Sequence, residues 1–189
     1  MDSAVAILGG GCFWCLEACY QELRGVIGVE SGYCGGTVPA PSYEQICRGD
    51  TGHAEVVRVE YDSALLSYDQ VLEVFFSIHD PTTRDRQGHD IGTQYRSAIF
   101  WLDEDQRTMA ESWIERLNRD EVFGRPLVTE LSPGQDSDGT GAPGGYRYYP
   151  AEAYHQRYFA RHPGEGYCRI VVAPKLSGFR KHHRELLQR

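Results

Sequence analysis

Three cysteines lie within eight residues near the start of the chain, directly behind three glycines, in the stretch GGGCFWCLEACY (Gly9–Tyr20). Close thiols are typical of metal, redox or nucleophilic chemistry. Phe13 and Trp14 directly follow the first cysteine, Cys12, and this aromatic pair predicts an apolar slot beside its sulfur atom. The rest of the sequence has to distinguish between the three kinds of chemistry.

Cys12 is predicted to stand at the start of a helix. The apolar run Val5–Leu8 indicates a short buried strand that stops at the glycines, and the apolar residues that follow Cys12 recur at helical spacing up to Gly25, a predicted C-terminal cap. Free backbone N–H groups and the macrodipole at a helix N-terminus lower a thiol pKa from about 8.5. We therefore predict a reactive thiolate at Cys12; a small buried core thiol is the alternative.

The two other cysteines of the stretch, Cys15 and Cys19, fall on the apolar stripe of the same helix, where an inert buried thiol is the ordinary outcome. The spacing Cys12-x-x-Cys15 is also that of a redox pair after a strand. Zinc is a third interpretation, although zinc usually takes four ligands in two pairs and the sequence has no second CxxC. Further zinc ligands could come from Cys34, Cys47 and His53.

Glu55 lies in the alternating stretch AEVVRVEYD, residues 54–62. It shares a strand face with Val57 and Val59, so we predict that it points into the core, where burial raises a carboxyl pKa and makes Glu55 a candidate general acid. The alternative is a strand-end residue that reaches water. His53 also allows a Cys-His-acid hydrolase to be drawn, but His53 and Glu55 would stand side by side on one strand face rather than in relay order.

The elements that must position these residues follow the order β-α-β-β-α-β over the first two-thirds of the chain. The predicted strands are residues 5–8, 26–34, 54–62 and 95–102, the helices between them are residues 12–25 and 67–79, and Asp103 caps a further helix to about Leu117. This order predicts an α+β fold, a ferredoxin-like βαββαβ two-layer sandwich whose antiparallel sheet carries both helices on one face.

C-terminal strand and helix elements are predicted to extend this core. RPLVTEL (125–131) and CRIVVA (168–173) indicate added strands, with a helix near Ala151–Arg161 between them. Ser132–Gly145, rich in glycine, proline and aspartate, predicts a mobile surface loop. The basic tail from Lys175 onward predicts a solvated helix.

Composition and length predict one globular catalytic domain spanning residues 1–189. With 189 residues and 41% apolar content, the chain can bury roughly 70% of its unfolded surface without disulfides. A formal charge of −8 argues against nucleic acid as a main partner. The N-terminus lacks a basic residue and its apolar run is too short for a signal peptide, and no run is long enough to span a membrane. We expect a cytoplasmic monomer whose six cysteines are kept reduced.

Several segments together resemble the peptide methionine sulfoxide reductase A family, which acts on the S epimer of methionine sulfoxide. The matching segments are GGGCFW, GYCGG, PSYEQICRGDTGHAEVV, HDPTTRDRQGHDIGTQYRSAI and GYC. They run in order from about Ile7 to Cys168, over most of the chain, and GCFW, TGHAE and QYRSAI are highly specific in combination.

The resemblance implies that Cys12 attacks the sulfoxide sulfur and becomes a sulfenic acid as methionine leaves, while Glu55 protonates the departing oxygen. Cys168 would then resolve the sulfenic acid into a disulfide. Cys15 stands where the family often has glycine and is the alternative resolving residue. The implied substrate-binding residues are Tyr43 and Tyr95 at the oxygen, Phe13 and Trp14 at the methyl group, and Asp90, His155 and Tyr167 around the pocket.

The same resemblance implies that thioredoxin or another dithiol reduces the disulfide, and that the enzyme needs no cofactor or metal. Its substrates would be free methionine sulfoxide or oxidised proteins, whose repair would be its role; the sequence does not distinguish between them. Two functions from other classes stay open at this point, a zinc-binding interaction module and a cysteine hydrolase.

Overall fold

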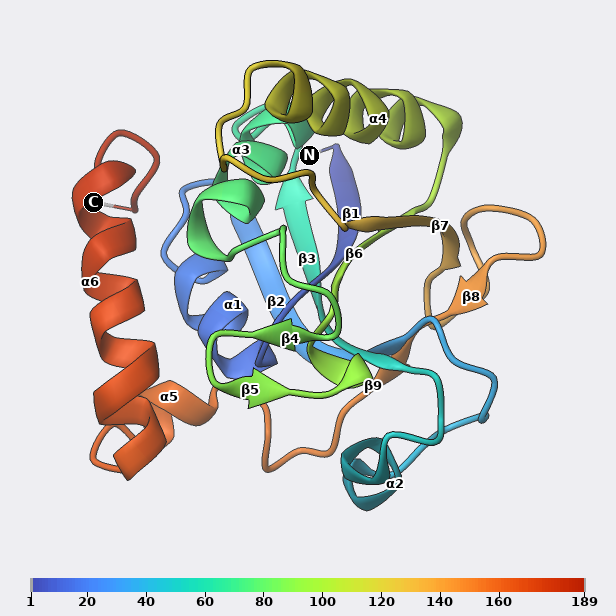
Figure 1. Cartoon of the computed structure of the whole chain (residues 1–189), viewed down its shortest axis with the longest axis vertical. Coiled ribbons are helices and arrows are strands. Elements are labelled where there is room, and N and C mark those ends of the chain that lie inside the picture. Colours follow the sequence, from blue (N-terminus) through green and yellow to red (C-terminus); the bar gives the residue numbers. More distant parts are fainter. Residues whose placement is uncertain (1, 189) are drawn as a thin grey trace.

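A seven-stranded mixed sheet is the centre of an α+β arrangement in the computed structural model, which describes residues 2–188 (Figure 1). The sheet has the order β8-β7-β6-β1-β3-β2-β9. Its strands are β1 (Ser3–Gly10), β2 (Val26–Cys34), β3 (Ala54–Asp62), β6 (Ser97–Trp101), β7 (Glu130–Gln135), β8 (Tyr146–Arg147) and β9 (Tyr149–Pro150). The α-helices are α1 (Phe13–Tyr20), α2 (Tyr43–Arg48), α3 (Tyr68–Ile78), α4 (Glu104–Arg119), α5 (Tyr158–Arg161) and α6 (Ala173–His182).

The four central strands β6, β1, β3 and β2 pair antiparallel with one another. Ala6 faces Val59 across the β1–β3 pair, and Gly9 faces Ala98 across the β1–β6 pair. β7 extends the sheet beyond β6 in parallel. A separate hairpin of β4 (Arg86–Gln87) and β5 (Asp90–Ile91) leads to the 3-10 turn η1 (Thr93–Tyr95).

Local sequence signals set several of these boundaries. The strands predicted at residues 26–34 and 54–62 are β2 and β3, with the predicted bounds. The capping box of Ser67 and Gln70 begins α3, and the Asp103 side chain accepts the N–H of Gln106 at the start of α4. These elements were predictable because both pattern and caps are local.

The first strand and helix differ from the predicted bounds. Gly9 and Gly10 continue β1 instead of ending it, and α1 ends at Tyr20 rather than at Gly25. Past the helix the chain is bound to the C-terminal tail, since Leu23 bridges Leu187 and the Arg24 N–H donates to Leu186 at 2.8 Å. These distant contacts override the local helix signal.

The predicted strand at residues 168–173 is wrong. Cys168–Val172 forms a π-helix, η2, that runs directly into α6, the predicted helix of the basic tail. Cys168, Val172 and Leu176 recur every four residues and all are buried, so they form the inner face of a helix, whereas Ile170 of the β-branched run is exposed. The helix predicted at Ala151–Arg161 is reduced to α5, its last turn.

The predicted surface loop Ser132–Gly145 and the strand before it are also corrected. The strand starts at Glu130 rather than at residue 125, and residues 132–135 belong to it as part of β7. Asp136, at the start of the remaining loop, is buried and ion-paired with Arg58 on β3. The loop is therefore anchored at its base, which its composition did not reveal.

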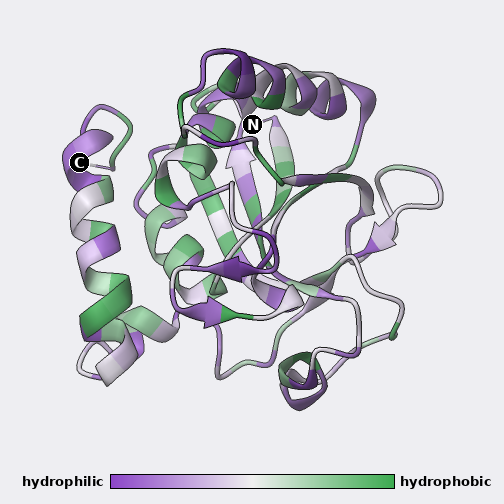
Figure 2. Cartoon of the chain, viewed as in Figure 1, coloured by the Kyte–Doolittle hydropathy of each residue, from purple (hydrophilic) through white to green (hydrophobic). Residues whose placement is uncertain are grey.

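The main hydrophobic core lies between the sheet and the helices, and it contains most of α1 and α3. Figure 2 shows α1 to be largely hydrophobic, whereas α4 is mostly hydrophilic. A smaller core around Ile7, Phe100 and Tyr148 is a separate cluster. Among residues 2–188, no helix has the length and apolar character that crossing a bilayer requires.

Candidate active site

Cys12 lies in the junction between β1 and α1, as the N-cap residue of the helix. Gly11 before it has φ +95°, and a Cβ at this position would come within 2.6 Å of the Gln87 side chain. Glycine is therefore required for the chain to turn and to approach the β4–β5 hairpin closely. The turn leaves Cys12 9% exposed at the edge of the main core. The predicted position of Cys12 directly before a helix is confirmed.

Glu55 projects from β3 into the protein beside this junction. It is 2% exposed, and its Oε2 accepts the Phe13 N–H at 3.1 Å. Burial raises the pKa of Glu55 to about 8, against the opposing effect of the Phe13 N–H, and the Asp90 charge adds to the rise. The predicted burial and raised pKa of Glu55 are confirmed, and its carboxyl is mostly protonated at neutral pH.

The predicted thiolate at Cys12 is wrong for the substrate-free protein. Burial raises the pKa of the Cys12 thiol well above its ordinary value, and hydrogen bonding to Cys15 and the charge of Glu55 raise it further. The Trp14 N–H acts in the opposite direction but is outweighed. One N–H of the first helical turn, that of Phe13, is already taken by Glu55, which weakens the helix-end effect on the sulfur.

Cys15 is the cysteine nearest to Cys12 in the sequence, and like Cys12 it lies in the main core. It is 2% exposed, its N–H donates to the Cys12 carbonyl at 3.1 Å, and hydrogen bonding to Cys12 lowers its pKa against the effect of burial. Cys19, one turn further on, is fully buried, and burial raises its pKa to about 12, which confirms the predicted inert thiol. The sequence-based interpretation of Cys15 as a redox partner therefore gains support over a purely structural role.

Cys168 reaches the same core from the far end of the chain. It is fully buried at the start of η2, which contacts α1, and it shares the main core with Cys12 and Cys15. Burial raises its pKa, and the charge of Cys15 raises it further. All six cysteines are free thiols. The fold thus gathers three of them, Cys12, Cys15 and Cys168, around the start of α1.

Aromatic rings form a wall beside Cys12. The Phe13 and Trp14 rings lie 6.4 Å apart between centroids, and Phe13 lies 5.0 Å from the His155 ring. Trp14 Nε1 donates to His155 Nδ1 at 3.3 Å, and the Trp14 ring stacks on Tyr158 at 3.8 Å. Phe13, Trp14 and His155, predicted to line the pocket, are thus in mutual contact. The sequence reasoning missed Tyr158, one of many tyrosines in its segment.

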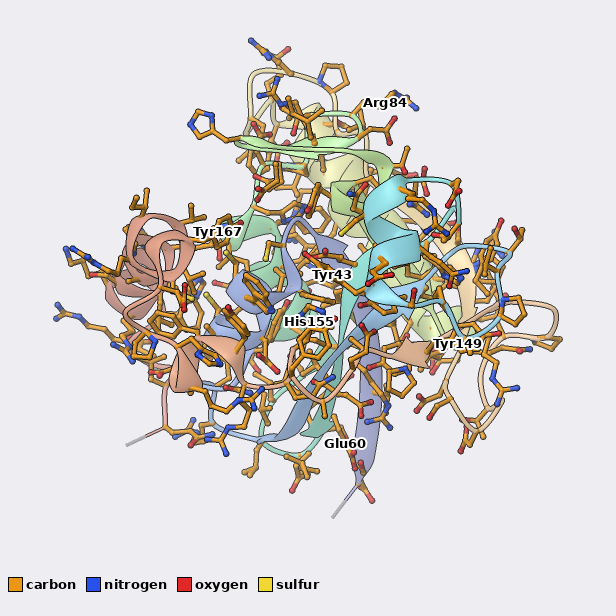
Figure 3. The ribbon with its side chains drawn as sticks, turned by 90° about the horizontal axis from the view of Figure 1, so that it is seen from below. Tyr43, Glu60, Arg84, Tyr149, His155 and Tyr167 are labelled. Carbon is orange, nitrogen blue, oxygen red and sulfur yellow. The ribbon has the colours of Figure 1, made fainter. Side chains whose placement is uncertain are left out.

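The three predicted pocket tyrosines surround the same centre. Burial raises the pKa values of Tyr43 and Tyr95, and the Glu55 charge raises both further, so both hydroxyls stay protonated. Tyr167 donates to Asp90 Oδ2 at 2.5 Å, which joins η2 to the β4–β5 hairpin. Figure 3 shows Tyr43 beside His155, whose ring centroids are 4.4 Å apart, with Tyr167 in the same part of the molecule.

Glu152 connects this group of side chains and was missed by the sequence reasoning. Its carboxylate accepts the Tyr43 N–H at 3.2 Å, the Tyr33 hydroxyl at 3.2 Å and the Tyr154 hydroxyl at 2.8 Å. His155 Nε2 lies 4.0 Å from Glu152 without a hydrogen-bond partner. A single carboxylate in an aromatic segment carries no periodic signal that could have revealed these contacts.

His53 does not belong to the reactive group. Its Nδ1 accepts the Gly36 N–H at 3.1 Å and its Nε2 contacts the Val38 carbonyl at 2.7 Å, so both ring nitrogens bond to backbone. A Cys-His-acid hydrolase would therefore lack its base. Within the described residues 2–188, no group of three or more His, Cys, Asp or Glu side chains is arranged to hold a metal ion, so the zinc module gains no support either.

The chain is similar to known proteins over almost its whole length. A family model described as peptide methionine sulfoxide reductase matches residues 4–187. The peptide methionine sulfoxide reductase MsrA of Chromobacterium violaceum is 51% identical over 183 residues, which cover 97% of this chain and 98% of the relative. The enzyme of the same name from Deinococcus radiodurans is 49% identical, over 97% of this chain and 84% of the relative.

Solved structures agree with these sequence matches. Methionine sulfoxide reductase A of Corynebacterium diphtheriae is similar with a TM-score of 0.76 and 34% identity, over 85% of this chain and 76% of that chain. Mxr1 from Saccharomyces cerevisiae in reduced form is similar with a TM-score of 0.72 and 30% identity, over 88% of this chain and 89% of that chain.

Proposed function

Since the chain belongs to the peptide methionine sulfoxide reductase family, we propose that Cys12 is the nucleophile and Glu55 the acid of a methionine S-sulfoxide reductase. The chain is an oxidoreductase that reduces methionine sulfoxide. The observation that carries the assignment of roles is the buried Glu55 carboxyl, with a pKa of about 8, bonded to the residue directly after Cys12.

The substrate oxygen is proposed to sit among three neutral donors. Glu55 supplies an acidic proton, and the hydroxyls of Tyr43 and Tyr95 complete the group around the oxygen. The methyl group of the sulfoxide rests against Phe13 and Trp14. This orientation presents the sulfoxide sulfur to the Cys12 thiol.

Protonation of Glu55 also activates Cys12. Because the Glu55 charge raises the Cys12 pKa, a neutral Glu55 removes that repulsion and leaves room for one negative charge on sulfur. The Cys12 sulfur donates an electron pair to the sulfoxide sulfur while Glu55 protonates its oxygen, and the Glu55 carboxylate takes up the thiol proton in exchange. The sulfur–oxygen bond of the substrate then breaks and the oxygen bonds to the Cys12 sulfur, while the new bond between the two sulfur atoms breaks and its electron pair leaves with methionine. Cys12 is left as a sulfenic acid. The methionine sulfur gains the two electrons that Cys12 loses.

Two successive thiol steps are proposed to clear the sulfenic acid. Cys15, whose N–H donates to the Cys12 carbonyl, attacks the Cys12 sulfur and releases water, giving a Cys12–Cys15 disulfide. Cys168 then attacks the Cys15 sulfur, which forms a Cys15–Cys168 disulfide and releases the Cys12 thiol. The charge of Cys15 raises the pKa of Cys168, so the two thiols are neighbours. Cys168 is buried in the same core as Cys15 and stands at the start of the π-helix η2, and π-helical turns frequently lie at functional sites.

An external dithiol is proposed to return the enzyme to its starting state. Mxr1 from Saccharomyces cerevisiae has been solved in complex with Trx2. We propose a thioredoxin as the reductant of this chain as well, attacking the disulfide that contains Cys168. Thiols then supply both electrons of each turnover, and the cycle requires no metal or cofactor.

The fold, setting and substrates are further parts of the proposal. The antiparallel order β6-β1-β3-β2, with α1 and α3 in the main core, supports a ferredoxin-like split βαβ within one catalytic domain. The six free thiols support a location in the reducing environment of the cytoplasm. We propose that the protein acts there as a monomer on free or peptide-bound methionine S-sulfoxide, repairs oxidised proteins and binds neither nucleic acid nor membranes.

Disulfide mapping after one equivalent of sulfoxide tests the proposal. The wild type should release about one methionine per enzyme without reductant and show a disulfide that contains Cys168. A Cys168→Ser variant should stop at the Cys12–Cys15 disulfide and stall with thioredoxin. A Cys15→Ser variant should accumulate Cys12 sulfenic acid; formation of Cys12–Cys168 at the wild-type rate would remove Cys15 from the pathway.

A further inference from the structure

Glu17 is a buried carboxylate on α1 that the proposed mechanism does not use. It is 1% exposed, and its Oε1 accepts the backbone N–H of Arg157 at 2.8 Å. Burial raises the pKa of Glu17 to about 7, while the N–H groups of Arg157 and Tyr158 oppose the rise. The carboxylate therefore joins α1 to a segment 140 residues further along the chain.

The segment that Glu17 binds carries two of the contacts of Trp14. Tyr158, the first residue of α5, stacks on the Trp14 ring with the planes 7° apart, and His155 accepts the indole N–H. Trp14 is thus held by His155–Tyr158, which we call the indole clamp. Glu17 and Trp14 stand three residues apart on the same helix, so one helical turn contacts the clamp twice.

The backbone of the indole clamp needs an external contact to keep its shape. Arg157 has φ +54° and ψ +37°, a left-handed conformation that is unfavourable for residues other than glycine. Such conformations persist where surrounding contacts hold them. The Arg157 side chain is exposed, so the bond from its N–H to Glu17 is the contact that holds this residue itself. The neighbouring Gln156 side chain bonds to the backbone of Ser31 on β2, which anchors the preceding residue of the clamp but not Arg157.

We propose that Glu17 is a positioning residue of the substrate pocket, which holds the indole clamp against Trp14 through the Arg157 N–H. The inference rests on the proposed function in one respect, because it takes Trp14 as the surface on which the sulfoxide methyl group rests. Without the bond the clamp relaxes, Trp14 loses its fixed orientation, and the substrate binds in many poses rather than one.

A purely structural Glu17 would behave differently. Loss of a buried hydrogen bond would lower the melting temperature and the fraction of folded enzyme, but correctly folded molecules would bind substrate as before. A positioning role changes the affinity of each folded molecule. Substrate affinity, measured on enzyme whose active fraction has been titrated through Cys12, therefore separates the two roles.

The experiment compares Glu17→Ala and Glu17→Gln. We expect Glu17→Ala to raise the KM for a blocked methionine sulfoxide about tenfold, with a single-turnover rate at saturation within about threefold of wild type. Glu17→Gln keeps an oxygen that accepts the Arg157 N–H and should stay within about twofold in KM. Asp136→Asn is the matched control, a buried carboxylate that ties a distant segment through Arg58 and should lower the melting temperature without changing KM.

Tyr158→Ala keeps the test decisive if Glu17→Ala fails to fold. It should raise KM by a similar factor, because Tyr158 is the member of the indole clamp that stacks on the Trp14 ring. An unchanged KM in Glu17→Ala and Tyr158→Ala would overturn the positioning role. That result leaves the proposed function standing; the function itself is overturned if Cys12→Ser still reduces the sulfoxide.

Discussion

Strand β3 carries an ionisable side chain on each of its two faces, the buried Glu55 and the half-buried Arg58, and their surroundings differ. On one face Glu55 accepts a single backbone N–H, and its pKa rises to about 8. On the other face Arg58 donates to both carboxylate oxygens of Asp136 at 2.8 and 2.9 Å and also to Glu60 at 3.2 Å. Hydrogen bonding to Asp136 raises the already high pKa of Arg58, so the guanidinium stays protonated.

The difference shows how one strand serves stability and chemistry at once. A half-buried charge that is fully paired stays ionised and ties segments together, as Arg58 ties β3 to the loop after β7. A buried carboxyl without a cation instead keeps its proton, which costs stability at high pH but leaves an acid beside a thiol. Alternation along β3 keeps Glu55 and Arg58 three residues apart in sequence yet on separate faces.

The largest expected effect is the loss of the nucleophile on the reactive face. Cys12→Ser should lower the rate of methionine sulfoxide reduction by on the order of 10⁴-fold, because a hydroxyl does not replace the thiolate. Its unfolding free energy should change little, since the swap conserves size. Methionine release with thioredoxin is the measurement, and substantial remaining turnover would contradict the assignment.

Glu55→Gln should lower the single-turnover rate by about 10³-fold, because the amide matches the neutral carboxyl in shape but has no proton to give. Methionine release in one turnover measures this, and an unchanged rate would remove Glu55 as the acid. Binding to the reduced enzyme should persist, since the amide still donates a hydrogen bond.

The same substitution should change how stability depends on pH. Glu55 has a pKa of about 8 in the folded protein against an ordinary value of 4.5, so the folded state binds its proton more tightly. The wild type then loses stability as pH rises from 4.5 to 8, by up to about 5 kcal/mol. Glu55→Gln escapes this loss and should become more stable relative to wild type between pH 5 and pH 8; parallel melting curves across that range would contradict the burial argument.

On the face of β3 that carries Arg58, a substitution should lower stability and leave the reaction rate unchanged. Asp136→Asn removes the bidentate partner of Arg58 and should lower the unfolding free energy by about 3 kcal/mol, because a partly buried guanidinium loses its counter-charge. Denaturant unfolding measures the loss, and the turnover of the folded enzyme should match wild type. A parallel fall in turnover would mean that the two faces are coupled through β3.

Local pattern was enough to predict which face of the strand Glu55 occupies, but not the ion pair of Arg58 with Asp136 on the other face. Strict alternation in residues 54–62 placed Glu55 in the core, and the resemblance over GCFW and TGHAE located Cys12 and Glu55 together. The capping residues Ser67 and Asp103 likewise revealed where two helices begin. In each case the information lies within a few residues of the feature it specifies.

Features that depend on distant contacts were not predictable. Glu17 accepts the backbone N–H of Arg157, 140 residues away, and Glu152 accepts that of Tyr43, 109 residues away. No pattern in the local sequence indicates either contact. Cys168 lies in a β-branched run whose helical form is decided by packing on α1. The raised pKa of Cys12 has the same origin, since burial and the nearby Glu55 charge exist only in the assembled fold.

The smallest expected effect compares the same chemical deletion on the two faces. Tyr95→Phe removes one proposed donor to the sulfoxide oxygen and should lower the single-turnover rate about tenfold, with Tyr43 and Glu55 still in place. Tyr148→Phe removes a buried hydroxyl that donates to Glu30 at 3.0 Å in the smaller core and should lower the unfolding free energy by about 1 kcal/mol. Rates and denaturation curves for both variants measure the contrast. If Tyr148→Phe slowed reduction, or Tyr95→Phe affected only stability, the chemistry would not be confined to the face that carries Glu55.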